Sequence, residues 1–198
     1  GVTRPLGDYF SEKALIRYRL LVEVEYFIAL CQLPLEQLRR FPHDKFEALR
    51  DLYRNFSDAD ALVVKEIEKT TNHDIKALEY FLKQRMDQIA GSEFVEFIHF
   101  GLTSQDVNNT AIPLSLKLGI EEVILPSLEQ LQEALKALSL AWKDIPMLAR
   151  THGQAASPTT AGKEMLVFLE RIQRQSIQLR SAEYPGKFGG ATGNFNAH

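Results

Sequence analysis

The sequence has 198 residues, 45% of them hydrophobic and 25% charged, with a formal net charge of −3. This is enough chain and apolar content for one or two globular domains with a buried core. The slightly acidic balance argues against a nucleic-acid-binding surface, and no apolar run of about 18 residues is present to span a membrane. Cys31 is the only cysteine, so an internal disulfide is excluded and we expect a cytoplasmic protein.

Helical periodicity dominates residues 1–91, which we predict to form a small helical N-terminal domain. Ser11 is expected to cap a first helix that ends before Pro34. A shorter helix follows Pro42. Ser57 is expected to cap a third helix, because acidic residues fill the first turn of SDADALVVKEIEKT. A fourth helix with a buried apolar side follows the polar sequence TNHD.

Residues 92–198 are predicted to form the first part of a long-helix bundle. A long helical stretch with Pro113 inside it follows LTSQDVNN, and the connector KDIPMLARTHGQAAS interrupts the pattern. Ser157 and Pro158 are expected to restart it as N-cap and first helical residue. The leucine stripe between residues 128 and 142 and a second stripe between 165 and 179 indicate packing against other long helices. No alternating strand pattern is longer than a few residues, so the predicted class is all-α.

Three polar clusters lie at breaks between the predicted helices: TTNHD at 70–74, HFGLTSQDVNN at 99–109 and RTHGQ at 150–154. Helix starts expose unpaired N–H groups and a partial positive charge, which favour anions. Converging helix ends could therefore hold a substrate with several carboxylates or a phosphate. Each cluster alone is also typical of helix capping, since Asn, Asp, Ser and Thr are common N-cap residues.

Of the histidines, His152 is the strongest candidate for acid–base chemistry. Gly153 beside it lets the backbone approach a ligand closely, and a histidine with a pKa near 6.5 exchanges a proton at neutral pH. His73 alone is typical of a surface or capping residue, His99 of a partly buried structural residue, and His43 of a surface turn. No HExxH, paired-cysteine, P-loop or GxSxG pattern is found, and we predict neither a metal nor a cofactor.

Taken together, TSQDVNNTA, RTHGQAASPTTAGKE and TTNHDIKALEYFL resemble the adenylosuccinate lyases of the fumarase/aspartase superfamily. The sequence GGATGNFNAH agrees with the bacterial branch of that family. The resemblance extends from about Ser11 to His198. It implies β-elimination, in which adenylosuccinate is cleaved to AMP and fumarate, and a succinylaminoimidazole carboxamide ribotide of purine synthesis is cleaved in the same way.

The resemblance also implies roles for individual residues. His152 matches the general acid, and His73 matches a second active-site histidine that helps to position the substrate and His152. The substrate-binding residues that it implies are Asn72, Asp74, Thr103, Ser104, Thr151 and Gln154. Thr103 and Ser104 match hydroxyls that bind a succinyl carboxylate.

The sequence departs from the family pattern in three respects, one of which is that the remaining bundle helices and the C-terminal domain of the family are absent. The family's catalytic base is a serine in a GSSxMPxKxNP-like loop, and no such stretch occurs here. The early Arg-Tyr pair that grips the nucleotide phosphate is also missing, and Arg4 is not a safe substitute. These absences predict an amino-terminal portion of the enzyme. Because active sites of the family combine segments from three subunits of a homotetramer, we expect this portion to be inactive alone. We also expect it to self-associate through its two apolar stripes.

Two other interpretations are kept. The first is another fumarate-releasing lyase, such as argininosuccinate lyase, against which TSQD and THGQ argue. The second is a non-catalytic helical scaffold whose polar breaks are helix caps. The scaffold explains each cluster singly, but not the three together in this order and spacing.

Overall fold

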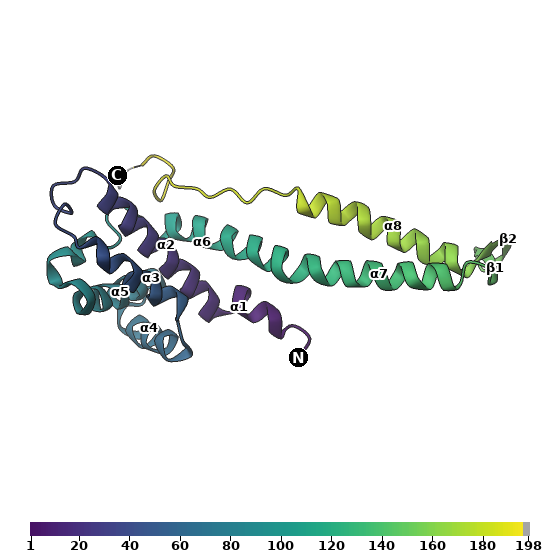
Figure 1. The fold of residues 1–198 in the computed structure, drawn as a ribbon, viewed down its shortest axis with the longest axis horizontal. Helices are drawn as coiled ribbons and strands as arrows, with labels where there is room; N and C mark the ends of the chain where they lie inside the picture. The colour runs from purple at the N-terminus through teal and green to yellow at the C-terminus, as the bar shows by residue number, and fades with distance from the viewer. Residues whose placement is uncertain (196–198) are drawn as a thin grey trace. The chain divides into compact units, whose positions relative to one another are not determined.

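The computed structural model describes residues 1–195 (Figure 1). Its elements are η1 Arg4–Leu6, α1 Gly7–Phe10, α2 Glu12–Gln32, η2 His43–Lys45, α3 Phe46–Arg54, α4 Asp58–Thr71, α5 Asp74–Ala90, η3 Ser92–Phe97, α6 Ser104–Gly119, the π-helical turn η4 Ile120–Ile124, α7 Leu125–Ala141, β1 Pro146–Thr151, β2 Gln154–Thr160 and α8 Ala161–Arg180. The prediction of an all-α fold is confirmed, with one small hairpin added. No helix of the described part has both the length and the apolar character needed to cross a membrane.

The chain divides into two compact units. Unit 1 comprises Gly1–Lys117 and the segment that begins at Tyr184, and unit 2 comprises Leu118–Glu183. The predicted domain boundary at residue 91 stays a prediction. The last residues of the GGATGNFNAH sequence, 196–198, lie outside the described residues.

The core of unit 1 is built around α2. The Ser11 hydroxyl caps this helix by accepting a hydrogen bond from the Ala14 N–H at 3.1 Å, as predicted. The helix ends at Gln32 because Leu33, which precedes Pro34, is held in an extended conformation. Buried residues of α2 pack with α3, α4, α5 and η3 in one apolar cluster, and most sides of α2 are covered. Polar residues buried in this helix therefore need a specific partner.

The α4 helix begins with the predicted cap. Ser57 and Asp60 exchange hydrogen bonds in a capping box, with Ser57 N–H donating to Asp60 at 3.0 Å and Asp60 N–H donating to Ser57 at 3.2 Å. Two orphan donors at the helix start are satisfied in this way. Arg85 of α5 donates to the other oxygen of Asp60 at 3.0 Å, which connects this helix start to the neighbouring helix.

Unit 2 is a helical hairpin in which α7 and α8 lie side by side, with the β1–β2 hairpin at one end (Figure 1). The two strands are antiparallel, and Thr151 pairs with Gln154 at the turn. Where α8 begins, its first N–H groups donate to the last carbonyls of α7 and its connector: Ala161 to Ile145 and Gly162 to Trp142, each at 3.0 Å. Backbone N–H groups at the start of α8 are therefore paired with backbone C=O groups that follow the end of α7.

The prediction that Ser157 and Pro158 begin a helix was wrong. Both lie in β2, where Pro158 pairs with Leu148, and α8 begins three residues later, at Ala161. Thr160 is the actual cap, since its hydroxyl accepts from the Lys163 N–H at 3.3 Å. A proline is tolerated in β2 because each strand of a two-stranded sheet has a free edge.

Candidate functional site

The first polar cluster forms the turn between α4 and α5. Asn72 ends α4 in the left-handed conformation, with φ 50°, and its N–H donates to the Glu68 carbonyl at 2.8 Å. His73 is extended and caps α5 with its side chain, because its Nδ1 accepts a hydrogen bond from the Lys76 N–H at 3.2 Å. The capping interpretation considered for His73 is therefore confirmed, whereas Asn72 is the C-cap of α4 and Asp74 is the first residue of α5.

This cap determines which ring nitrogen of His73 carries a proton. Nδ1 accepts a backbone N–H, so the neutral ring carries its proton on Nε2. The Oγ atom of Ser104 lies 3.4 Å from Nε2. The clusters at 70–74 and 99–109 therefore meet at His73 and Ser104, which are both at starts of helices.

Asp106 organises the second cluster. Its Oδ2 accepts from both the N–H of Thr103, at 2.9 Å, and the Thr103 hydroxyl, at 2.8 Å. Its Oδ1 accepts from the N–H groups of Gly189 and Gly190, each at 2.9 Å. Burial raises the pKa of Asp106, but these hydrogen bonds outweigh burial and lower it to about 2. The Asp106 carboxylate, which is 1% exposed, is thus ionised at neutral pH and accepts hydrogen bonds from four donors.

Arg19 connects the clusters at 70–74 and 99–109. This side chain belongs to α2 and is only 9% exposed, so it needs partners. Its guanidinium contacts the carboxylate of Asp74 at 2.8 Å and donates from Nε to the Asn108 side chain, also at 2.8 Å. Burial raises the pKa of Asp74, but the Ile75 N–H and the Arg19 charge outweigh it and lower that pKa.

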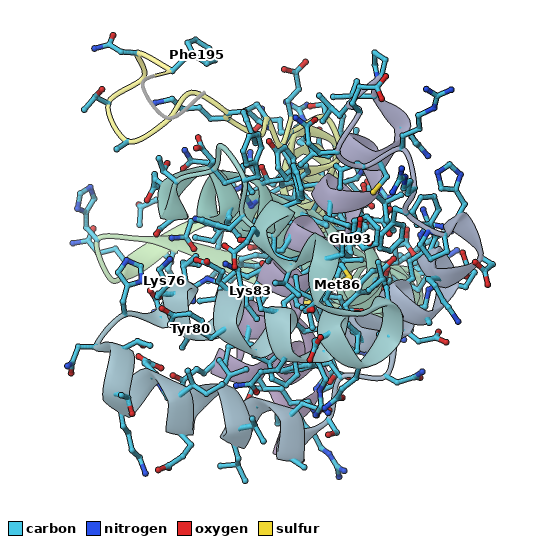
Figure 2. All side chains as sticks on the ribbon, turned by 90° about the vertical axis from the view of Figure 1, so that its left-hand side faces the viewer. Lys76, Tyr80, Lys83, Met86, Glu93 and Phe195 are labelled. Carbon is cyan, nitrogen blue, oxygen red and sulfur yellow. The ribbon has the colours of Figure 1, made fainter. Side chains whose placement is uncertain are left out.

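A second charged network runs along α5. Glu79 is 5% exposed and pairs with Lys76 at 2.6 Å and with Lys83 at 3.3 Å. Figure 2 shows Lys76 and Lys83 on this helix. Nearby, the ring of His99 lies 2.5 Å from the buried carboxylate of Glu23. His99 is mostly buried, with a structural partner on α2, which confirms the prediction made for it.

The third cluster forms the turn of the β1–β2 hairpin. His152 and Gly153 occupy the two turn positions with φ of 50° and 75°. Two left-handed residues in a two-residue loop are the signature of a type I′ turn, whose twist matches that of the paired strands. Thr151, His152 and Gln154 are all exposed at this tip. The side chain of His152 is thus exposed at the tip of the hairpin of unit 2.

The structure thus brings together part of the predicted site. Residues of 72–74 and 103–104 lie around one junction in unit 1, whereas those of 151–154 lie at the hairpin tip in unit 2. Sequence reasoning missed Arg19, Asp106 and Asn108 as organising residues. The available signal for Arg19 was its helical spacing from the apolar residues Leu15 and Val22, which places a charge on the predicted buried face. No group of three His, Cys, Asp or Glu side chains in residues 1–195 is arranged to hold a metal ion.

Comparison with known proteins identifies the family. A family model described as a lyase matches residues 3–198. The chain belongs to this lyase family. It is 54% identical over its whole length to an adenylosuccinate lyase of Dictyostelium discoideum, and 45% identical over 98% of its length to an adenylosuccinate lyase of Escherichia coli. It spans 44% and 43% of those two relatives, respectively.

Solved structures agree with this assignment. A fumarate lyase from a Mesorhizobium species is 26% identical, with a TM-score of 0.78, and the match covers 98% of this chain and 44% of that one. A 3-carboxy-cis,cis-muconate lactonizing enzyme from Pseudomonas putida is 23% identical, with a TM-score of 0.75, over 98% of this chain and 43% of that one. The second likeness supports the fold alone.

Proposed function

We propose that the protein containing this chain is an adenylosuccinate lyase. It would release fumarate from adenylosuccinate to give AMP, and from the succinylaminoimidazole carboxamide ribotide. The observation that carries the proposal is the 54% identity to an adenylosuccinate lyase across this whole chain, within which all three polar clusters fall. The scaffold alternative does not account for this degree of identity to an enzyme over the whole chain.

The reaction is a β-elimination. A base removes a proton from the carbon β to the leaving nitrogen, and the negative charge spreads onto the neighbouring carboxylate. The carbon–nitrogen bond then breaks, and an acid protonates the departing amine nitrogen, which leaves AMP and fumarate. His152 is the proposed acid, because the family resemblance matches it to the general acid and its ring is exposed at the hairpin turn.

The junction in unit 1 supplies groups suited to the succinyl end of the substrate. The Asp106 and Val107 N–H groups at the start of α6 donate to the Thr103 carbonyl, whereas the Ser104 N–H is of the kind that a helix start directs at an anion. The Ser104 hydroxyl and His73 Nε2 lie at the same helix start. We assign to His73 the positioning of substrate and of His152. Asn72, Asp74, Thr151 and Gln154 are assigned to substrate binding, with no metal or cofactor required.

The proposal includes a homotetramer whose active sites combine several subunits, in the cytoplasm. Exposed apolar side chains on unit 2 support further helix packing, among them Leu140, Leu166, Phe168 and Ile177. These 198 residues contain no GSSxMPxKxNP-like stretch to supply the serine base. The chain alone is therefore proposed to be inactive, and turnover of adenylosuccinate by it would contradict this part.

The experiment measures fumarate release by the full-length protein, with adenylosuccinate and argininosuccinate offered separately. Release from adenylosuccinate alone is expected, and His152→Gln should reduce it by a factor of about 100 or more, as for loss of a general acid. His43→Gln is the matched control, since His43 is an exposed residue of η2. Release from argininosuccinate instead would favour the related lyase, and release from neither would favour the scaffold.

A further inference from the structure

The two neighbouring hydroxyls at the start of α6 are not equivalent. The Thr103 hydroxyl lies 2.8 Å from Oδ2 of Asp106, and a carboxylate can only accept. The proton of that hydroxyl is therefore committed to Asp106. The same oxygen of Asp106 also accepts the Thr103 N–H. Thr103 thus has neither its hydroxyl proton nor its amide proton available for a substrate carboxylate.

Ser104 has the opposite arrangement. The partner of its hydroxyl is Nε2 of His73, at 3.4 Å, and the cap made by Nδ1 assigns the proton to Nε2. The ring is therefore the donor and Ser104 Oγ is the acceptor. The proton of Ser104 stays available, and a hydroxyl that accepts one hydrogen bond is a better donor of the next.

We propose that Ser104 alone is the side-chain donor of this pair to the succinyl carboxylate, and that Asp106 is a positioning residue which holds Thr103 away from the substrate. This inference rests on the proposed function. It replaces the symmetrical role that the family resemblance implied for Thr103 and Ser104 with a division between them.

Asp106 positions more than the helix start. Its second oxygen holds the N–H groups of Gly189 and Gly190, which lie more than 80 positions later in the chain. The adjacent Phe188 packs against Tyr26 of α2, with ring centroids 5.6 Å apart. The glycine-rich segment is therefore fixed against the same turn that presents Ser104. Loss of the negative charge on Asp106 would weaken its hydrogen bonds to Thr103 and to the glycine-rich segment at the same time.

Kinetic constants of the full-length protein test the division, together with the Kd for fumarate from calorimetry. Ser104→Ala should raise KM and the fumarate Kd by about tenfold or more, as for loss of a hydrogen bond to a charged group. Thr103→Val should change both by less than about threefold while lowering the Tm, because this hydroxyl serves Asp106. Ser115→Ala removes a hydroxyl that bonds to Ile112 within α6 and should change neither.

Asp106→Asn tests the positioning role. An amide would turn an N–H group toward one of the two donor pairs, so KM should rise at least as much as in Ser104→Ala while the circular dichroism spectrum stays native. A lower Tm with unchanged KM would show that Asp106 is only structural and would overturn its assignment. Thr103→Val raising KM as much as Ser104→Ala would overturn the division of roles.

The proposed function and this inference fail in different ways. Wild-type protein that binds fumarate but releases none from adenylosuccinate would overturn the function alone, and the fumarate Kd values of the variants would still decide between Thr103 and Ser104. Wild-type protein that neither releases nor binds fumarate would overturn both.

Discussion

The start of α8 makes a backbone contact that tolerates only glycine at position 162. A Cβ atom added at Gly162 would lie 2.4 Å from the Ser139 carbonyl oxygen and 2.7 Å from both N and Cα of Lys143. All three atoms belong to the backbone, so no side-chain rotation relieves the clash. We therefore predict that Gly162→Ala destabilises unit 2 by separating the first turn of α8 from the end of α7.

The magnitude follows from three contributions. Overpacking against backbone costs up to about 3 kcal/mol. Moving α8 away also weakens the hydrogen bonds from Ala161 to Ile145 and from Gly162 to Trp142, each worth about 1 kcal/mol. Alanine gains about 1 kcal/mol over glycine in helix propensity. The net loss is about 2–4 kcal/mol, which corresponds to a fall in Tm of roughly 5–15 °C for a chain of this size.

Thermal and urea unfolding of the 198-residue chain, followed by circular dichroism, measures this loss. Gly7→Ala is the matched control, because a Cβ atom at Gly7 would meet nothing within 4 Å and the φ of −60° there suits alanine. The control should leave stability unchanged or slightly raised. A Gly162→Ala chain as stable as the wild type would refute the close backbone contact between α7 and α8.

Three further predictions concern other parts of the chain. Burial alone would lower the pKa of His99, but the hydrogen bond and charge of Glu23 outweigh it and raise the pKa above 6.5. The contribution of the His99–Glu23 pair to folding stability is therefore complete below pH 6.5 and is lost as the pH rises through the raised pKa. NMR titration should show this pKa falling in Glu23→Gln, and an unchanged value would contradict the pairing. Ser57→Ala should cost about 1 kcal/mol in urea unfolding, and no loss would exclude a contribution from the capping box. Light scattering should show self-association of the chain, and a monomer across a broad concentration range would contradict it.

Helix starts were predictable where one local interaction decides them. Ser11 and Ser57 each bond an N–H three residues later, and both were predicted from residue type alone. The start of α8 was misplaced because a Ser-Pro pair and a threonine three residues later offer similar local signals. The pairing of Pro158 with Leu148 decides between them, and strand pairing is not visible in a local pattern.

The site was predictable in part for the same reason. Residue types identified His73 and Ser104 as candidates, yet their contact depends on how α5 and α6 meet. The bond from Asp106 to Gly189 joins residues 83 positions apart, and the partners of Arg19 lie on two other helices. Such contacts follow from tertiary packing, so the sequence indicates which residues need partners but not which partners they find.

The left-handed backbone at His152 has an evolutionary consequence. A type I′ turn is best served by Asn-Gly or Gly-Gly, and a residue other than Gly, Asn or Asp gives up roughly 1 kcal/mol in this conformation. Selection for heat resistance alone would therefore replace His152 by Asn or Gly, and such variants should fold more stably than the natural chain. A histidine here is what the proposed role of His152 as the acid would require, at a cost in stability.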